Sequence, residues 1–302
     1  MKIALFSQDI NKDVETVFQS ILSHEEATKC NFFIFKNLRN SVAKTDQNLY
    51  EFFDNYSDLT ENLDIFISIG GDGTFLRSIE FVRNLNLPII GINTGRLCFL
   101  ASTKKENLEK SLLKIFNKKF VSEKRSLLKV STNCNTISEK SFPYALNEIS
   151  VVRKDTTSMI NVRTSLDGTY INSYWSDGLI VSTPTGSTGY SLSCGGPVIS
   201  PSSNSLVLTP ISPHNLNARP LVISDSTKIE ISVAGREDFH LITIDAKIYT
   251  LKNETKIFLE KADFDIKVAN INNYNFFKTL KNKLFWGKDK RCTGKTNFWG
   301  SW

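Results

Sequence analysis

The first third of the chain alternates between short apolar runs and segments with helical spacing. The runs KIALF, FFIFK, LDIFISIG and LPIIGIN are continuous, as in strands that are buried on both faces of a parallel sheet. After the first run, Val14, Val17, Phe18 and Ile21 recur at helical spacing, and FLRSIEFVRNL shows the same period. Repeated strand–helix–strand units predict an α/β layer with right-handed crossovers.

A further helix is expected to begin at TKKE. Thr103 and Glu106 match a capping box, and Leu108, Leu112 and Ile115 follow as an apolar stripe. This helix would close the α/β part of the chain.

From about residue 120 the helical period nearly vanishes and β-rich segments follow one another, among them INVRTSL, TYINSYW, GLIVSTP and KIEISVA. Asp167-Gly168, between two such runs, is a hairpin turn signal. We therefore predict an α/β domain over residues 1–120 and a mostly β domain over 121–270. Residues 271–302 are predicted to form a C-terminal helix and a tail, docked back on the N-terminal domain.

Composition narrows the class of protein. The chain has 302 residues, of which 40% are hydrophobic, which is enough for a sizeable core. A net charge of +6 suits anionic small molecules, and we expect no nucleic acid as a partner. No apolar run reaches the roughly 18 residues that cross a bilayer, and no signal peptide is apparent, so we expect no membrane association. Five scattered cysteines without CxxC spacing indicate reduced thiols in a cytoplasmic protein.

The stretch SIGGDGTFL combines a buried strand, a glycine turn and the start of a helix. Gly70, Gly71 and Gly73 can bring backbone N–H groups close to phosphate oxygens. Asp72 would repel a phosphate, but it can accept the proton of an alcohol that attacks a phosphoryl group. The motif therefore favours a kinase that acts on an alcohol. A tight turn without a ligand is the structural alternative.

A second dense motif, SDGLIVSTPTGSTGYSLSCGGPVISPSS, extends from Ser176 to Ser203. Its hydroxyls and glycines suit a ligand with many hydroxyls and a phosphate, whereas a serine-rich surface loop is the alternative.

Together these motifs resemble the NAD kinase family. GGDGT, INTGRLCFL, ALNEI, DGLIVSTPTGSTGYSLSCGGPVISP and TPISPHNLNARPLV occur in that family's order and spacing, over roughly residues 63 to 250. The resemblance implies a Rossmann-like N-terminal domain and a mostly β C-terminal, NAD-binding domain, with the active site between them. It implies ATP-dependent phosphorylation of the 2′-hydroxyl of the adenosine ribose of NAD, giving NADP, with a divalent metal for which Mg²⁺ is expected. It also implies a homodimer or homotetramer.

The resemblance assigns roles to residues of this chain. Asp72 is implied to be the proton acceptor, with Gly73 beside it against the ligand. Asn147 and Glu148 are implied to hold ribose hydroxyls and the adenine amino group. The remaining implied NAD contacts are Arg77, Phe99, Asp177, Thr188, Gly189, Tyr190, Ser193 and Lys247. The glycines Gly70, Gly71 and Gly73 are expected to bind the phosphates.

The chain departs from the family pattern at four places. Cys98 replaces a usual glycine, Gly189 replaces a usual alanine, and Trp175 stands where a polar or basic residue is common. The family's Asp-Gly-Gln motif reads Asp245-Ala246-Lys247 here. A ligand contact of the missing glutamine is therefore in question, and Lys247 is a candidate to contact a phosphate instead.

Two other functions remain open from the sequence alone. Lipid and sugar kinases share the GGDGT turn, although TPTGSTGYS and ALNEI argue against them. A non-catalytic NAD or NADP sensor would keep the pocket, but would have little need for Asp72 at the phosphoryl-transfer position.

Overall fold

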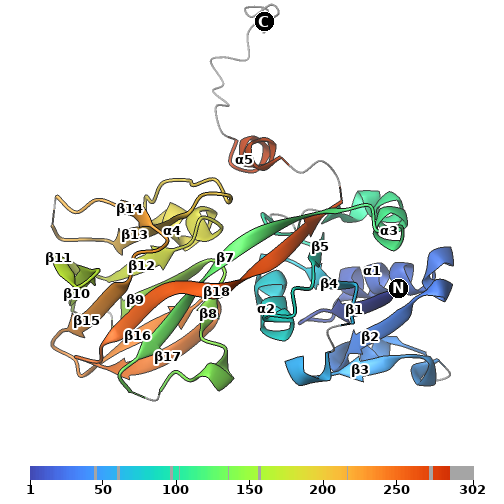
Figure 1. Ribbon diagram of the computed structural model, residues 1–302, viewed down its shortest axis with the longest axis horizontal. Helices are drawn as coiled ribbons and strands as arrows, with labels where there is room; N and C mark the ends of the chain where they lie inside the picture. The colour runs from blue at the N-terminus through green and yellow to red at the C-terminus, as the bar shows by residue number, and fades with distance from the viewer. Residues whose placement is uncertain are drawn as a thin grey trace, which may run out of the picture.

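Two lobes lie side by side, an α/β lobe formed by the N-terminal third and a β-rich lobe (Figure 1). This computed structural model describes residues 1–43, 46–59, 62–95, 98–101, 103–134, 136–155, 158–215, 217–271 and 275–285. The long strands β7 (Val121–Thr132) and β18 (Ile257–Asn270) extend from one lobe to the other. Within the described part of the chain, every helix is too short or too polar to span a membrane.

The N-terminal lobe is a parallel sheet in the order β3-β2-β1-β4-β5, with a short sixth strand beside β5. Its strands are β1 (Lys2–Phe6), β2 (Asn31–Phe35), β3 (Glu51–Phe53), β4 (Ile65–Gly70), β5 (Ile89–Asn93) and β6 (Thr103–Lys104). Its α-helices are α1 (Lys12–Leu22), α2 (Asp72–Val82) and α3 (Leu108–Phe116). The apolar runs of the sequence thus form the buried parallel strands that they predict.

The helix expected at TKKE begins later than predicted. Thr103 lies in β6 and pairs with Ile92, and a 3-10 turn over Lys105–Asn107 follows it. α3 starts at Leu108, and its N-cap, Asn107, makes no side-chain capping bond. The helix starts later than predicted because pairing with β5 continues the strand through Thr103, and the capping box stays a prediction.

The C-terminal lobe contains two packed sheets. One is a six-stranded antiparallel sheet in the order β14-β13-β12-β9-β16-β17. Its strands are β9 (Glu148–Arg153), β12 (Gly178–Ser182), β13 (Ser205–Ile211), β14 (Leu221–Ser224), β16 (Phe239–Ile244) and β17 (Lys247–Lys252). The other contains β7, β18, β8 (Tyr144–Ala145), β10 (Ile160–Leu166), β11 (Thr169–Ser176) and β15 (Ile229–Ala234). The predicted hairpin turn joins β10 to β11, with φ of 47° at Asp167 and 78° at Gly168.

The lobes share one continuous sheet of twelve strands. β18 pairs in antiparallel fashion with β7 and β15, and in parallel with β5 at Val268 and Ile89. The predicted α/β fold with a mostly β second part is confirmed, but the two parts are joined through their strands. The domain limits at residues 120 and 270 stay predictions.

Three apolar clusters form the core. One packs α1 and α3 against one face of the parallel sheet, and another fills the space between the two sheets of the C-terminal lobe. The third lies on the other face of the parallel sheet, where Phe75 and Ile79 of α2 meet Leu127, Leu146 and Ile266. α2 is therefore packed between the two lobes.

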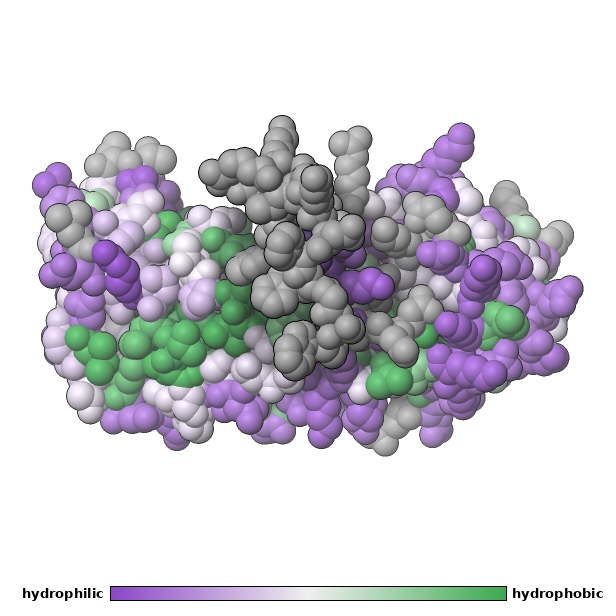
Figure 2. All heavy atoms as spheres, turned by 90° about the horizontal axis from the view of Figure 1, so that it is seen from above, coloured by the Kyte–Doolittle hydropathy of each residue, from purple (hydrophilic) through white to green (hydrophobic). Residues whose placement is uncertain are grey.

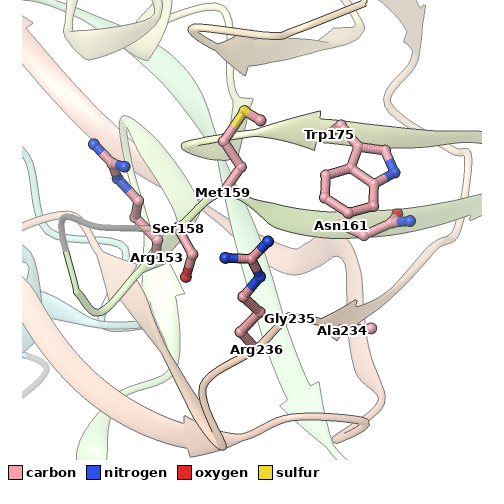
Figure 3. A pocket seen from close by; sticks show the side chains of 8 residues that line it. All are labelled: Arg153, Ser158, Met159, Asn161, Trp175, Ala234, Gly235 and Arg236. Atoms are coloured by element: carbon pink, nitrogen blue, oxygen red, sulfur yellow. The ribbon is translucent and has the colours of Figure 1, made fainter.

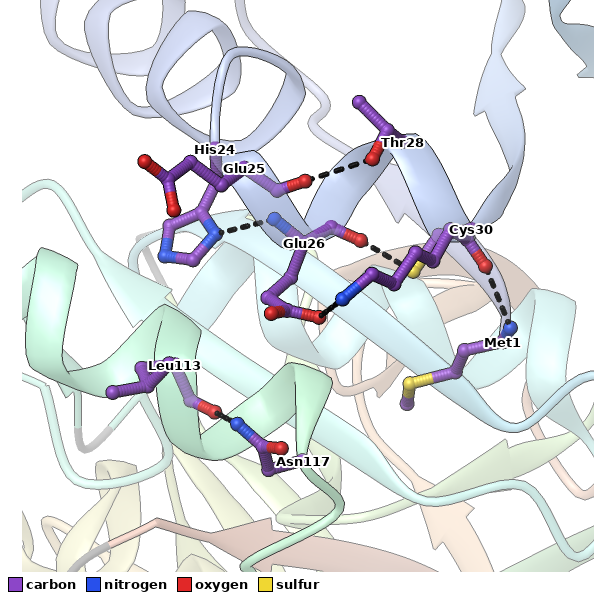
Figure 4. A network of polar contacts seen from close by, with 9 residues as sticks. Met1, His24, Glu25, Glu26, Thr28, Cys30, Leu113 and Asn117 are labelled. Atoms are coloured by element: carbon purple, nitrogen blue, oxygen red, sulfur yellow. Dashed lines mark hydrogen bonds and ion pairs between the residues drawn. The ribbon is translucent and has the colours of Figure 1, made fainter.

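The amino ends of the parallel strands are tied together by local polar contacts (Figure 4). The N-terminal amino group donates to the Lys29 carbonyl at 3.3 Å, and Lys29 pairs with Glu26 at 2.9 Å. The His24 ring accepts the Glu26 N–H at 3.2 Å. This network stabilises the edge of the sheet opposite to the glycine turn.

The last described helix, α5 (Phe276–Lys283), contacts the N-terminal lobe. The Lys283 ammonium lies 5.0 Å from the centroid of the Phe99 ring, and Phe276 lines a small space together with Phe99 and Leu100. The predicted tail beyond residue 285 lies outside the described residues.

Candidate active site

The glycine turn lies at the carboxyl end of β4, the edge of a parallel sheet where ligands bind. Gly70 has a φ of +154°, and a Cβ there would lie 2.4 Å from the Thr74 hydroxyl oxygen, so only glycine fits. Gly71 is the N-cap of α2 without a capping side chain, and a Cβ on Gly73 would meet nothing within 4 Å. Because the first N–H groups of an α-helix have no intrahelical partner, this turn can serve as an anion site.

Asp72 is the first residue of α2, and its carboxylate holds the loop that follows β5. Oδ2 accepts the Phe99 N–H at 2.7 Å, and Oδ1 accepts those of Leu100 at 2.9 Å and Ala101 at 3.4 Å. A carboxylate offers about four acceptor positions, so roughly one remains for a further donor. An alcohol is a suitable donor for that position.

Cys98 lies beneath this turn. Its thiol donates to Asn93 Oδ1 at 3.0 Å, and burial raises its pKa to about 11. Its sulfur would lie 3.8 Å from a Cβ on Gly71. The cysteine that replaces the family's glycine is therefore a buried, protonated packing group.

Asn147 and Glu148 stand at the start of β9, where a buried carboxylate fixes their backbone. Asp245 accepts the N–H groups of Leu146 at 2.8 Å, Asn147 at 2.9 Å and Glu148 at 3.0 Å. Asp245 has a φ of 47° in the turn between β16 and β17, and burial raises its pKa to about 6. In the sequence Asp245 stands out only as part of an altered motif, and nothing near it in the chain indicates this role.

Glu148 carries an oxygen without a partner. Its Oε2 is buried and has no hydrogen-bond partner. Burial, and then the charge of Asp245, raise the pKa of Glu148 to about 8, against the opposing effect of the Tyr190 N–H. A buried orphan acceptor is costly unless a bound donor satisfies it, and an amino group or a hydroxyl of a ligand would do so.

The TPTGSTGYS segment packs closely against these residues. The Thr183 hydroxyl donates to the Leu146 carbonyl at 2.5 Å, and a Cβ on Gly186 would lie 2.1 Å from the Asn147 carbonyl oxygen. A Cβ on Gly189 would lie 2.9 Å from Glu148 Oε2, so glycine leaves the room that the family's alanine would take. Thr188, within this segment, is half-buried.

The segment then ends in α4 (Tyr190–Ser193). The side chains of Tyr190 and Ser193 are exposed. Partial burial first, and then the neighbouring Cys194 and Asp177, raise the pKa of Tyr190. Thr185, in the same segment, lines a small space with Phe99 and Leu100. The structure therefore brings the TPTGSTGYS segment next to the loop that Asp72 holds.

Asp177 contacts one of the residues that line a pocket on the C-terminal lobe. It pairs with Arg153, with 3.2 Å between Oδ1 and Nε. Figure 3 shows the guanidinium groups of Arg153 and Arg236 and the Trp175 ring around this pocket of about 450 Å³.

Arg77 and Lys247 lie where the two lobes meet. Both line a narrow space between α2 and the turn from β16 to β17. Arg77 is exposed, whereas Lys247 pairs with Glu80 at 2.8 Å and donates to the Ser141 carbonyl at 2.7 Å. The implied phosphate contact of Lys247 stays a prediction.

Among the described residues, no group of three or more His, Cys, Asp or Glu side chains is arranged to hold a metal ion. Mg²⁺ commonly needs only one or two carboxylates when substrate phosphates supply other ligands.

The geometry defines a class of protein. An open helix N-terminus beside a carboxylate with a spare acceptor position suits phosphoryl transfer to an alcohol, and the buried acceptor on Glu148 suits a nucleoside. The fold and the site are those of a two-domain α/β nucleotide-dependent phosphotransferase.

Comparison with known proteins gives the family. Residues 11–120 match the ATP-NAD kinase N-terminal domain, and residues 146–270 match the ATP-NAD kinase C-terminal domain. The chain is 46% identical to the NAD kinase of Flavobacterium psychrophilum over 293 residues, which cover 96% of this chain and 100% of the relative. It is 48% identical to that of Christiangramia forsetii over 294 residues, with the same coverage. The chain belongs to the NAD kinase family.

Solved structures agree with this fold. The yeast NADH kinase complexed with NADH superposes with a TM-score of 0.84 at 20% identity, covering 97% of this chain and 89% of that one. An NAD kinase from Archaeoglobus fulgidus in complex with ATP superposes with a TM-score of 0.71 at 28% identity, covering 94% and 99%. The resemblance read from the motifs is confirmed.

Proposed function

We propose that this NAD kinase transfers the terminal phosphate of ATP to the 2′-hydroxyl of the adenosine ribose of NAD. The observation that carries the proposal is Asp72, whose carboxylate is fixed by three backbone N–H groups at the open end of α2. In the reaction the 2′-oxygen forms a bond to the γ-phosphorus while its proton passes to Asp72. The bond between the γ-phosphorus and the bridging oxygen breaks, and ADP leaves.

General-base catalysis by Asp72 and positioning of the substrates contribute differently to the rate. General-base help of this kind supplies on the order of 10²–10⁴-fold, and positioning of the two substrates supplies most of the remainder. We assign phosphate binding to Gly70, Gly71 and Gly73, because the N–H groups of the first turn of α2 have no intrahelical partner.

The nucleoside end of NAD is assigned to the other lobe. Asn147 and Glu148 would accept ribose hydroxyls and the adenine amino group, which gives the orphan Glu148 Oε2 a donor. Phe99 would cover the adenine. The further contacts that we propose are Gly73, Arg77, Asp177, Thr188, Gly189, Tyr190 and Ser193.

Mg²⁺ is proposed to enter with ATP, since phosphate oxygens and water can supply most of its ligands. When bound, it would neutralise charge on the phosphates. We place the enzyme in the cytoplasm, because Cys30, Cys98, Cys134 and Cys194 are free thiols and reducing compartments preserve such groups.

A homodimer or homotetramer is proposed from the edges of the sheets. β11 and β14 are edge strands, and they expose Ile171, Trp175 and Val222 by 44%, 49% and 46%. Figure 2 shows a continuous apolar stretch on the C-terminal lobe. Exposed apolar edges favour pairing with another copy, which light scattering would detect as a mass of two or four chains.

The test is an end-point assay with NAD, ATP and Mg²⁺, in which a dehydrogenase that accepts only NADP reports the product. Formation of NADP is expected, since only the 2′-phosphate makes NAD a substrate for that dehydrogenase. NAD binding without product would favour the sensor function. Neither binding nor product, together with phosphorylation of a sugar or a diacylglycerol, would favour the other kinases.

A further inference from the structure

An ion pair joins the two lobes beside the candidate site. Lys247 is the first residue of β17 in the C-terminal lobe, and Glu80 lies on α2 in the N-terminal lobe. Their Nζ and Oε2 atoms are 2.8 Å apart, and the two side chains are 25% and 32% exposed. The pair is partly shielded from water, so its interaction is stronger than that of a fully solvated pair.

The Lys247 ammonium is held in place by its own lobe. It donates to the Ser141 carbonyl at 2.7 Å and lies 5.7 Å from the centroid of the Phe142 ring. Both partners belong to the segment before β8. The lysine therefore presents a fixed charge to α2, and little side-chain entropy is lost when it pairs with Glu80.

Glu80 is rigidly connected to Asp72. Both residues lie on α2, eight positions apart, which is about two turns or about 12 Å of helix. Phe75 and Ile79 anchor the same helix in the apolar cluster that spans the lobes. A small rotation of α2 at Glu80 would therefore move the carboxylate of Asp72.

The turn that carries Lys247 also contacts the start of β9, the strand to which nucleoside binding is assigned. Asp245, two positions before Lys247, accepts the N–H groups of Leu146, Asn147 and Glu148. The turn between β16 and β17 thus holds the start of β9 through Asp245 and holds α2 through Lys247.

We propose that Lys247 and Glu80 form a latch between the lobes that sets the position of Asp72 relative to Asn147 and Glu148. Lys247 is then a positioning residue that acts through Glu80, not a residue that contacts a phosphate. This inference rests on the proposed roles of Asp72, Asn147 and Glu148. The latch would explain the role of Lys247, which replaces the glutamine of the family motif.

The test is a double-mutant cycle with Lys247→Gln, Glu80→Gln and the double variant, measured for kcat and for the KM of NAD and ATP. A latch predicts that each single variant lowers kcat about threefold to tenfold, with each KM within twofold, and that the double variant is no worse than either. Lys256→Gln, which breaks the Lys256–Glu230 pair of 3.0 Å within the C-terminal lobe, is the matched control and should leave both parameters unchanged.

Three outcomes would overturn the latch. A raised KM in Lys247→Gln with normal kinetics in Glu80→Gln would show a direct phosphate contact, because a carboxylate cannot attract a phosphate. Fully additive losses would show that the two residues act independently. Lower melting temperatures with unchanged kcat and KM would show a purely structural pair. A wild-type enzyme that makes no NADP would instead overturn the proposed function, so the two failures are distinguishable.

Discussion

At the scale of single residues, the site depends on two half-buried carboxylates that have different partners. Asp245 accepts hydrogen bonds from the backbone N–H groups of residues 146–148, whereas Oε2 of Glu148 has no partner. Burial raises the pKa of both, to about 6 for Asp245 and about 8 for Glu148. Asp245 therefore fixes the backbone of the site, and Glu148 is available to bind a ligand.

Glu148 should make the stability of the protein depend on pH. Its pKa rises from 4.5 to about 8 on folding, so the folded state binds more protons between these values. The free energy of unfolding should therefore fall as the pH rises through this window, and Glu148→Gln should remove that part of the slope. Urea unfolding at pH 5 and pH 8 measures it.

We expect the unfolding free energy of Glu148→Gln, minus that of wild type, to be larger at pH 8 than at pH 5. Glu237→Gln, at an exposed turn, is the control and should follow the wild-type slope. Equal pH slopes for wild type and Glu148→Gln would contradict the raised pKa.

At the scale of elements, the site depends on the close approach of the TPTGSTGYS segment to the start of β9. Gly186 lies so near the Asn147 carbonyl that a Cβ would be only 2.1 Å from its oxygen, and that oxygen also accepts the Thr183 N–H at 2.9 Å. The TPTGSTGYS segment therefore acts as a support for β9 as well as a contact surface.

Gly186→Ala should push this segment away from β9. Overpacking of this kind typically costs about 1–3 kcal/mol of unfolding free energy, and NAD affinity should fall with it. Gly73→Ala is the stability control, because its Cβ meets nothing within 4 Å. Thermal unfolding and calorimetric titration with NAD measure both effects, and an unchanged melting temperature for Gly186→Ala would refute the close approach.

Local signals predicted the elements that depend on neighbours in the sequence. The β4–GGDGT–α2 unit and the Asp167-Gly168 hairpin follow from apolar period and turn chemistry, and both are confirmed. Thr103 was placed at the start of the helix, whereas it pairs with Ile92 of β5, a partner that the local sequence does not reveal. Asp245 and the Lys247–Glu80 pair could not be found this way, since their partners are about 100 and 167 positions away in the chain.

At the scale of the whole molecule, the two lobes depend on each other. β18 extends the parallel sheet through β5, and α2 packs in a cluster with residues of the C-terminal lobe such as Leu127 and Ile266. The change in hydrophobic patterning near residue 120 suggests two independent domains, and this shared sheet is not apparent from it. The shared sheet keeps the two halves of the site in register.

A fragment of residues 1–120 should therefore fail to fold as a stable unit. It would lose the pairing of β5 with β18 at Ile89 and leave the apolar face of α2 partly exposed. Circular dichroism and urea unfolding, with a chain ending at residue 285 as the control, measure this. Cooperative unfolding of the fragment at the midpoint of the control would contradict the interdependence of the lobes.

The most direct test of the account is the turnover of Asp72→Asn with NAD and ATP, measured beside its affinity for NAD. If Asp72 is the general base, kcat falls by about 10²–10⁴-fold, because an amide cannot accept the proton of the 2′-hydroxyl. NAD affinity should fall far less, since the residues assigned to the nucleoside lie mostly on the other lobe. A variant that forms NADP at the wild-type rate would show that Asp72 only holds the loop at residues 99–101, and that the central claim is wrong.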